Sequence, residues 1–581
     1  MLKKKRFGRL NDLRRNLMFI QLSGRLANVV YSMDTTNTEF LPYQYKPVLT
    51  FLESPCNGLL IADEVGLGKT IEAGLIWTEL RARYDARRLV VVCPAMLRDK
   101  WCMELGNRFG VDATQLDASE LAKELKRGKY ETRDGKGYVC SLQGLRPPPD
   151  WRDTDKRYGR AGLARVLDEL TESEPAIDLL VIDEAHYLRN PETQSAALGR
   201  MLRDVSEHVV LLSATPVNNQ ADDLYQLLRL VDPDSFNVRD QFPQVLAANE
   251  PLIRARNLVL DLSSTGEQIR HQLKSAQAHP LLKGNRQLRG VLEEPMDAAF
   301  LSENANRVAL ADRVERINLL RHTICRTRKV EVHEWKVVRE ANSDFVEVDP
   351  DGAEREFYVR VTDAIRRYAR AKDISDGFLL SLPQRQMSSC MYAAAISWAD
   401  RSAVWDAASQ VYEDQGGIES PRQNDVRPLI RHIASEVLPG FDIDLLERQD
   451  SKFERFCEVV TRYLTKHPSE KIIVFAYFKP TLNYLNDRLS SVGITCQTLH
   501  GDIAENKQDA IHRFRDSRGT RVLLTSEVAS EGVDLQFCSF VVNYDLPWNP
   551  MKIEQRIGRI DRIGQRAERV LIWNMGYANT I

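Results

Sequence analysis

The hydrophobic positions of residues 40–228 fall in short continuous runs, and the segments between these runs carry apolar residues at helical spacing. Continuous apolar runs bounded by turn residues are typical of strands that are buried on both faces of a parallel sheet. The alternation of such strands with helices predicts an α/β lobe. The expected strands lie in the runs GLLIAD, RLVVVCP, DLLVIDEA and HVVLLSAT.

Residues 451–581 repeat this pattern. The runs KIIVFAYF, ITCQTLHG, RVLLTS, FVVNYD and RVLIWN predict strands, and segments such as QDAIHRFRD predict the helices between them. Two α/β lobes with parallel sheets are therefore expected, and no tandem repeat of short period is evident.

The chain between the two lobes has a different pattern. Residues 245–320 and 352–440 carry apolar residues at helical spacing and few β-branched runs, so both are predicted to be helical insertions. The expected organisation is a basic N-terminal segment, a first lobe, a helical protrusion with the inter-lobe linker, a helical insertion and a second lobe. Their predicted bounds are 1–39, 40–228, 229–345, 346–450 and 451–581.

The composition is that of an ordinary globular protein, with 43% hydrophobic and 28% charged residues in 581. Because the formal net charge is only −2, a surface that binds nucleic acid must be a local patch. The nine cysteines include no Cys-x-x-Cys pair, which predicts free thiols in a reducing compartment and no zinc site. No apolar run is long enough for a membrane span or a signal peptide, so no membrane association is expected.

A candidate nucleotide site lies in the run LLIADEVGLGKTIEAGLI. A loop between a strand end and a helix start presents backbone N–H groups and the helix dipole to phosphate. Gly66 and Gly68 allow the tight backbone with positive φ that such a loop needs. Lys69 is expected to reach the β and γ phosphates, and Thr70 to offer its hydroxyl to Mg²⁺. Asp63 stands where the general pattern has Gly.

Two adjacent carboxylates, Asp183 and Glu184, follow an expected strand in the run LLVIDEAHYLRN. At a strand end, one carboxylate of such a pair can orient Mg²⁺ while the other activates the attacking water. An exposed acidic turn is the alternative. The phosphate loop in the same lobe favours the catalytic interpretation.

The run EQRIGRIDRIGQ in the second lobe supplies basic side chains for the other half of a hydrolytic site. Charge develops on the γ-phosphate in the transition state, and arginine fingers can compensate it. Arg559 and Arg562 are three residues apart and are predicted to project from one face of a helix. A basic surface helix with solvated arginines is the alternative.

The combination of DEVGLGKT and DEAH resembles the Swi/Snf-type ATPases of helicase superfamily two, in which an Asp at the position of Asp63 is usual. The resemblance covers residues 40–581, and an ordered set of motifs of this kind is specific. The further segments that follow in family order are LPYQYKPV, VVVCPAMLRDKW, VCSLQGL, LLSATPVNN, LYQLLRLVDPDSF, ICRTRKVEV, DSKFERF, TLHGDI, LLTSEVASEGVDLQFC, NYDLPWNP and EQRIGRIDRIGQ.

This resemblance implies two RecA-like lobes with ATP and Mg²⁺ as cofactors, and it assigns roles to individual residues. The implied catalytic residues are Asp183, Glu184, Lys69, Gln555, Arg559 and Arg562, the last two as arginine fingers. The implied ATP-binding residues are Gln44, Asp63, Glu64, Gly66, Gly68, Lys69, Thr70 and Asp534, with Thr70 and Asp183 holding Mg²⁺ through ATP. The implied nucleic-acid contacts are Ser141, His500, Gly501, Thr525 and Ser526, and the implied coupling residues are Ser213 and Thr215. For His500 and Thr525, ordinary loop capping is the alternative.

Within the family, the segments DEVGLGKTIEAGLI and LPQRQMSSCMYAA resemble the bacterial RapA-like branch, and defence-associated bacterial ATPases look similar. The implied function is ATP-driven translocation along duplex DNA with displacement of bound proteins, in the bacterial cytoplasm at the nucleoid. RNA polymerase and other subunits of a bacterial complex are the protein partners that this branch implies. The family usually continues into further helices, so the second lobe is expected to be truncated after its last strand.

Two other functions remain open from the sequence. One is a strand-separating helicase that acts on DNA or RNA. The other is a nucleotide-gated module that binds nucleic acid or RNA polymerase with negligible turnover. The presence of Lys69, Glu184, Arg559 and Arg562 argues against the second, because a module without turnover has no need of a base and arginine fingers.

Overall fold

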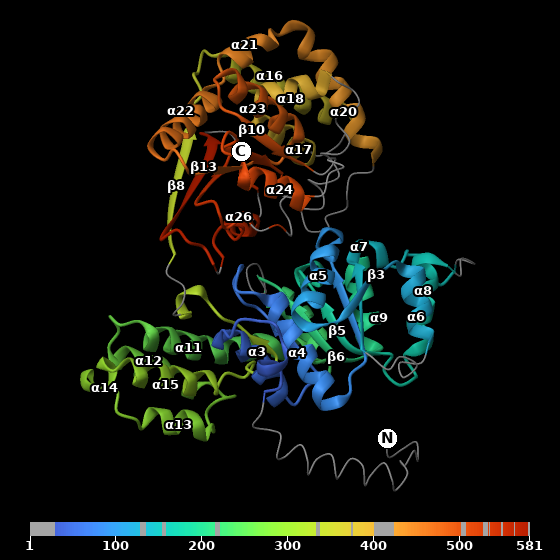
Figure 1. The fold of residues 1–581 in the computed structure, drawn as a ribbon, viewed down its shortest axis with the longest axis vertical. Coiled ribbons are helices and arrows are strands. Elements are labelled where there is room, and N and C mark those ends of the chain that lie inside the picture. Colours follow the sequence, from blue (N-terminus) through green and yellow to red (C-terminus); the bar gives the residue numbers. More distant parts are fainter. Residues whose placement is uncertain are drawn as a thin grey trace. The chain divides into compact units, whose positions relative to one another are not determined.

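The computed structural model describes residues 30–127, 135–153, 158–214, 221–332, 337–372, 376–399, 423–500, 507–526, 533, 535–547, 550–562 and 564–578. The predicted site residues Thr215, Gly501 and Asp534 lie outside these ranges. The chain divides into two compact units, and each unit is built around its own sheet (Figure 1). The first comprises Gly68–Arg328 with the residues up to Glu64, and the second comprises Lys329–Ile581 with Val65–Leu67. Within the described ranges, no helix has the length and apolar character needed to cross a membrane.

The first lobe contains a seven-stranded sheet in the order β3-β4-β2-β5-β6-β1-β7, and all of its pairings are parallel. Parallel neighbours need crossover connections, and helices supply them here. The four apolar runs predicted as strands form β1, β2, β5 and β6. The strand bounds are β1 Gly58–Ile61, β2 Arg88–Cys93, β3 Asp112–Leu116, β4 Lys136–Ser141, β5 Ile177–Ile182, β6 Ser206–Leu212 and β7 Ile324–Cys325.

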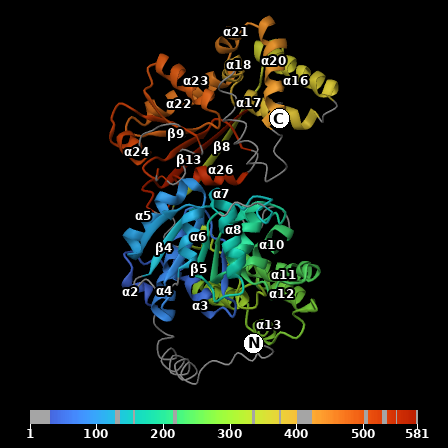
Figure 2. The ribbon, with the colours of Figure 1, turned by 90° about the vertical axis from the view of Figure 1, so that its right-hand side faces the viewer.

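Successive side chains of a strand point to opposite faces of the sheet. Because both sets are apolar in this lobe, helices cover both faces. In β2, Leu89 and Val91 belong to one buried cluster, while Val90 and Val92 belong to another. The turned view in Figure 2 shows the elements of this lobe from the side. The helix bounds are α2 Ser32–Thr35, α3 Pro42–Glu53, α4 Lys69–Tyr84, α5 Arg98–Phe109, α6 Ala118–Lys126, α7 Leu142–Leu145, α8 Gly159–Leu170, α9 Gln194–Asp204 and α10 Ala221–Val231.

The second lobe contains a six-stranded sheet in the order β10-β11-β9-β12-β13-β8, again with parallel pairings throughout. All five runs predicted as strands of this lobe are strands. Their bounds, with β8, are β8 Val338–Val346, β9 Ile472–Phe475, β10 Cys496–Leu499, β11 Val522–Thr525, β12 Phe540–Asn543 and β13 Arg569–Tyr577. The helices of the lobe are α21 Ile443–Arg448, α22 Ser451–Lys466, α23 Lys479–Ser491, α24 Lys507–Asp516 and α26 Pro550–Ile557.

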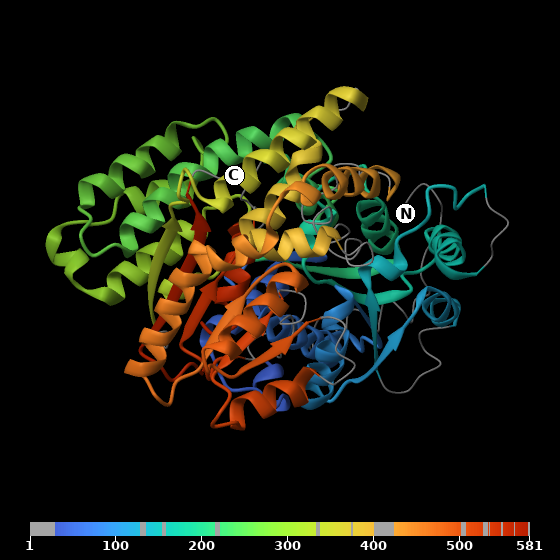
Figure 3. The same ribbon diagram turned by 90° about the horizontal axis from the view of Figure 1, so that it is seen from above.

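Two helical segments are inserted into this plan, and each has a core of its own. In the first, Leu252, Val259 and Leu273 share one buried cluster, and Figure 3 shows its green helices running side by side. In the second, Phe357 and Trp398 are stacked in another cluster. The helices are α11 Phe242–Leu260, α12 Gly266–Ala278, α13 Arg286–Leu292, α14 Ala298–Ser302, α15 Asn304–Glu315, α16 Ala353–Lys372, α17 Asp376–Ser389, α18 Met391–Ala399 and α20 Gln423–Glu436.

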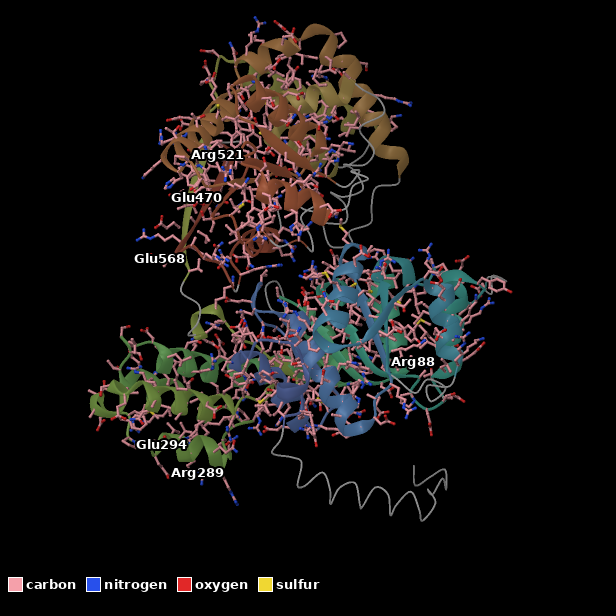
Figure 4. All side chains as sticks on the ribbon, viewed as in Figure 1. Arg88, Arg289, Glu294, Glu470, Arg521 and Glu568 are labelled. Atoms are coloured by element: carbon pink, nitrogen blue, oxygen red, sulfur yellow. The ribbon has the colours of Figure 1, made fainter. Side chains whose placement is uncertain are left out.

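Arginine side chains make hydrogen bonds at the amino ends of two strands, β2 and β11. Arg88 at the start of β2 donates to the carbonyls of Ala176 at 2.9 Å and Arg127 at 3.0 Å. Arg521, just before β11, donates to the carbonyls of His467 at 2.5 Å and Glu470 at 3.3 Å, and Figure 4 labels it beside Glu470. The opposite, carboxyl ends of the strands are where ligands bind in open α/β sheets.

Candidate functional site

The phosphate loop connects the end of β1 to the start of α4. Gly66 and Gly68 both have φ of 95°, which side-chain-bearing residues rarely adopt. Gly68 is the N-cap of α4 and provides no side-chain cap, so the first N–H groups of the helix remain available to an anion. A Cβ at Gly68 would lie only 2.5 Å from Nε2 of Gln44, so the loop also passes close to this predicted ATP-binding residue.

The ammonium group of Lys69 lies over the loop backbone. Its Nζ donates to the carbonyl of Asp63 at 2.9 Å and approaches the carbonyl of Glu64 at 3.5 Å. Lys69, Glu64 and Thr70 are half-buried. A cation, an uncapped helix terminus and two positive-φ glycines in one loop are the groups that a nucleotide phosphate chain requires.

Asp63 supports the loop from inside the lobe. Its side chain is fully buried, and Oδ1 accepts the backbone N–H of Thr327 at 2.7 Å. Thr327 follows β7, which pairs with β1. The departure from glycine at this position therefore has a physical reason, because the carboxylate connects the phosphate loop to the segment that closes the sheet.

Glu72, which the sequence analysis did not single out, forms a buried pair with Asp63. Glu72 lies in the first turn of α4 and is fully buried. Burial and the neighbouring Asp63 carboxylate raise the pKa of Glu72 well above its usual range. Burial also raises the pKa of Asp63, although the hydrogen bond from Thr327 and the nearby Lys69 ammonium oppose this.

The two candidate catalytic carboxylates lie directly after β5. Glu184 has φ of 50° and ψ of 48°, a left-handed conformation that costs energy for a residue with a side chain. Its Oε2 lies 3.2 Å from Nδ1 of His186. Strained backbone of this kind concentrates at active sites, where surrounding contacts hold it in place. Both side chains remain partly exposed, with 24% exposure for Glu184 and 22% for His186.

Asp183 is held by two hydrogen bonds. Its Oδ1 accepts the N–H of Glu184 at 2.8 Å, and its Oδ2 accepts Nε1–H of Trp101, on α5, at 3.0 Å. Burial and the nearby Glu184 carboxylate raise the pKa of Asp183 to about 6, against the effect of these donors. One carboxylate with phosphate oxygens and water is a donor set that suits Mg²⁺. The residues present therefore fit a magnesium nucleotide.

The arginines of the second lobe do not lie on one helical face, so that prediction is wrong. The helix α26 ends at Ile557, and Arg559 and Arg562 follow on an irregular turn. Both are half-buried, and Nε of Arg562 donates to the carbonyl of Gly558 at 2.8 Å. Gln555 lies within α26, also half-buried.

A buried carboxylate explains why the helix ends there. Asp561 is fully buried, and its Oδ2 lies 2.6 Å from both Nζ of Lys329 and Nε of Arg339. Bending the chain after Ile557 brings Asp561 to these two cations, and an unpaired buried carboxylate would be very unfavourable. The turn that carries the arginines is thereby fixed to β8 and to the linker before it.

A polar network connects the second helical insertion to α26, the helix that precedes the turn with Arg559 and Arg562. Ser389, at the end of α17, donates to Oδ2 of Asp545 at 2.7 Å. The same oxygen accepts the N–H of Tyr477 at 2.8 Å, and the carbonyl of Asp545 accepts Nη1 of Arg556 at 2.8 Å. Lys452, fully buried, donates to the carbonyl of Ser389 at 3.0 Å. None of these connections was predicted from the sequence.

The candidate nucleic-acid contacts differ in how accessible they are. Ser141 caps α7 by accepting the N–H of Gly144 at 3.3 Å, and it is half-buried, as are His500 and Ser526. Thr525 is fully buried and donates to the carbonyl of Ser526 at 3.1 Å. This local hydrogen bond fits the alternative of ordinary loop capping for Thr525.

The coupling candidate Ser213 directly follows β6 and is fully buried. Its N–H donates to the carbonyl of Ile61, the last residue of β1, at 3.0 Å. It therefore lies at the carboxyl edge of the sheet, where the phosphate loop begins.

Comparisons with known proteins match most of the chain to described families and relatives. Residues 43–393 match the family described as SNF2-related domain, and residues 451–564 match the helicase conserved C-terminal domain. A relative in Bacillus subtilis (strain 168), described as the uncharacterized ATP-dependent helicase YqhH, is 26% identical over 546 residues, which are 93% of this chain and 76% of the relative.

Two solved structures are also similar. The Sulfolobus solfataricus SWI2/SNF2 ATPase core in complex with dsDNA is 16% identical, with 93% of this chain and 88% of that one covered and a TM-score of 0.30. The Pyrococcus furiosus Hef helicase domain is 16% identical, with 93% and 96% covered and a TM-score of 0.40.

Because the SNF2-related match spans more than half of the chain, the chain belongs to the SNF2-related family of helicase superfamily two. It is a helicase-like, nucleic-acid-dependent ATPase with two RecA-like lobes.

Proposed function

We propose that this ATPase is a translocase that moves along duplex DNA and displaces bound proteins without separating the strands. The observation that carries this proposal is the pairing of the strands: every strand pair in the described parts of both sheets is parallel. A β-hairpin, which is a rigid element suited to wedging a duplex apart, requires an antiparallel pair. The two insertions of the described chain are helical instead.

The first lobe supplies binding and the proton acceptor for hydrolysis. When bound with ATP, Mg²⁺ supplies charge stabilisation to the phosphate oxygens. Lys69 and the first N–H groups of α4 bind the phosphates, and Glu184 accepts the proton of the attacking water. Thr70 and Asp183 would hold the metal. The strained backbone and the contact with His186 support a fixed orientation of the Glu184 carboxylate.

The second lobe supplies positive charge as the transition state forms. Arg559 and Arg562 stabilise the charge of the transferring phosphoryl group, and Gln555 positions the γ-phosphate or the water. Because these residues and the phosphate loop belong to different lobes, each turnover is coupled to movement of the lobes. This coupling converts ATP hydrolysis into steps along the sugar-phosphate backbone of DNA.

Contacts to the nucleic acid are made to phosphates by Ser141, His500, Gly501 and Ser526. Hydroxyl groups and loop N–H groups suit phosphate oxygens, and phosphate contacts carry no direct sequence information. The expected motor therefore tracks duplex DNA with little sequence preference and with strong dependence on salt.

We further assign the chain to the RapA-like branch and place it in the bacterial cytoplasm, with RNA polymerase as its first candidate partner. The assignment is supported by the two segments that resemble this branch, DEVGLGKTIEAGLI and LPQRQMSSCMYAA.

One comparison of activities tests the proposal. Triplex displacement and forked-duplex unwinding are measured with the same protein and ATP concentration, beside the ATPase rate with duplex DNA, single-stranded DNA, RNA or no nucleic acid. The expected result is stimulation by duplex DNA and displacement of the third strand without unwinding. Unwinding without triplex displacement would identify a helicase, and ATP-dependent retention on DNA with neither activity would identify a binding module.

A further inference from the structure

Trp101 is a buried aromatic residue in direct contact with the candidate metal carboxylate. It lies on α5, with an exposed fraction of only 2%, and its Nε1–H donates to Oδ2 of Asp183 at 3.0 Å. The family segment VVVCPAMLRDKW ends on this residue, yet the roles assigned above leave it without a function.

We propose that Trp101 is a positioning residue for the magnesium nucleotide, because it fixes the orientation of the Asp183 carboxylate. This inference rests on the proposed role of Asp183 in holding Mg²⁺.

Besides the bond from Trp101, the Asp183 side chain accepts one further hydrogen bond in the described structure, and it comes from the adjacent backbone. Its exposed fraction is 9%, and its Oδ1 accepts the N–H of the adjacent Glu184. A carboxylate with a single donor can rotate about that bond, whereas two donors on different oxygens define the plane of the group. Each oxygen has two lone pairs, so both hydrogen bonds leave acceptor capacity for a metal or its water.

The indole ring is well suited to this purpose because it cannot move. Trp101 belongs to the same buried cluster as Val91, Cys93 and Leu105. The ring is therefore held by packing in the core of the lobe, and its N–H is a donor only. Outer hydrogen bonds that orient a metal ligand typically change metal affinity by 10- to 100-fold when they are removed.

The chain contains a matched control. Trp77, on α4 of the same lobe, is also fully buried, and its Nε1 has no hydrogen-bond partner among the described residues. Trp77→Phe removes a buried indole N–H of the same size without affecting a carboxylate. A merely structural role of Trp101 would make the two substitutions equivalent.

The test uses the full chain and measures nucleotide binding. The affinity for a fluorescent ATP analogue is measured over a Mg²⁺ titration and in EDTA. Trp101→Phe is expected to raise the Mg²⁺ concentration for half-maximal binding roughly 10-fold and to leave binding in EDTA unchanged. Trp77→Phe is expected to change neither value. Equal Mg²⁺ dependence in Trp101→Phe and the wild type would overturn the inference.

A double-mutant cycle tests whether Trp101 changes the Mg²⁺ dependence through Asp183. In an Asp183→Asn background, Trp101→Phe is expected to cause no further shift in the Mg²⁺ dependence, because the residue acts through that carboxylate. A shift of the same size in this background would contradict the mechanism. If the wild type itself shows no Mg²⁺-dependent nucleotide binding, the ATPase assignment fails instead, so the two failures are distinguishable.

A spectroscopic measurement avoids any dependence on the folding of Trp101→Phe. The chain has eight tryptophans, whose indole ¹⁵N–H signals can be observed together. Asp183→Asn is expected to move one of them upfield, because the donor loses a charged acceptor. If all of the indole signals keep their positions, the hydrogen bond is absent and the inference falls.

Discussion

Ser389 donates its hydroxyl hydrogen to Oδ2 of Asp545 over 2.7 Å, and this bond joins the end of α17 to the segment between β12 and α26. The carbonyl of Asp545 in turn accepts Nη1 of Arg556, one turn before Arg559. The helical insertion is thus connected to the arginine-bearing segment through a chain of hydrogen bonds from Ser389 to Asp545 and from Asp545 to Arg556.

This connection predicts a kinetic effect of Ser389→Ala. A hydrogen bond to a charged group contributes about 1.5–3 kcal/mol, so its loss is expected to lower kcat about 10-fold while the KM for ATP is unchanged. Steady-state ATPase measurements test this. The control is Ser388→Ala, since the hydroxyl of Ser388 bonds only to the carbonyl of Arg385 within the same helix. Equal kcat values for the two variants would contradict the prediction.

Lys69→Ala is expected to weaken ATP binding and hydrolysis together. The ammonium group supplies the positive charge that holds the β and γ phosphates, and charge-assisted hydrogen bonds are the strong ones. A loss of about 1.5–3 kcal/mol corresponds to roughly 10- to 100-fold in affinity. Calorimetric or fluorescence titration with ATP measures the change. Wild-type affinity in the variant would remove Lys69 from the site.

Glu184→Gln is expected to retain the binding of Mg²⁺-ATP and to lose turnover. The amide cannot accept the proton of the attacking water, while Asp183 still holds the metal. General-base catalysis is worth about 10²- to 10⁴-fold, and single-turnover hydrolysis measures the loss. Normal hydrolysis by this variant would exclude Glu184 as the base.

Arg559→Ala and Arg562→Ala are expected to act mainly on kcat. Their contacts strengthen as charge develops on the phosphoryl group, and an arginine finger contributes about 10³- to 10⁵-fold in rate. Arg566→Ala is the matched control, because Arg566 is exposed and lies just beyond the same turn. A loss of ATP affinity with unchanged kcat would instead identify a ground-state contact.

Glu354, on α16, predicts how the stability of the second lobe depends on pH. Burial raises the pKa of Glu354 to about 7, against the hydroxyl donors Ser451 at 2.6 Å and Tyr577 at 2.9 Å, while nearby Asp450 raises it further. The folded state therefore binds the proton more tightly than the unfolded state. The resulting stabilisation is complete below about pH 4.5 and is lost as the pH rises through 7, with a slope of at most about 1.4 kcal/mol per pH unit.

Urea unfolding between pH 5 and 8, monitored in the wild type and in Glu354→Gln, measures this effect. The wild type is expected to lose stability relative to the variant as the pH rises across that interval. Parallel pH profiles of the two proteins would show that the pKa of Glu354 is not raised in the folded lobe.

The sequence predicted the strands of both lobes well, because buried parallel strands are continuous apolar runs and carry their signal locally. It did not predict β3 or β4, whose short segments DATQL and KGYVCS mix polar residues with apolar ones, and it did not predict β7 or β8. The two residues of β7 are too short for a pattern, and β8 is an edge strand whose charged side chains are balanced by ion pairs such as Glu340 with Arg569. Partners distant in sequence decide both strands.

The candidate site was predicted unevenly for the same reason. The phosphate loop and the Asp-Glu pair are short motifs whose chemistry is local, so their residues were found directly. Trp101 and Ser389 make hydrogen bonds to residues distant in sequence, and Glu72 is buried beside Asp63, which no local pattern records. The helical prediction for Arg559 and Arg562 was wrong because their spacing fits a helix, whereas buried Asp561 bends the chain.

The hydrogen bond between Asp63 and the backbone of Thr327 has a consequence for the order in which the parts of the protein fold during translation. The two residues are 264 positions apart, and helices α11–α15, with their separate core, lie between them. While the chain emerges from the ribosome, these helices can pack as soon as they are complete. The open edge of β1 and the carboxyl group under the phosphate loop must wait for residues 324–327. The phosphate loop therefore gains this support after the helices of the protrusion have formed, although its own sequence is translated first, and until then the edge of β1 has no β7 to pair with.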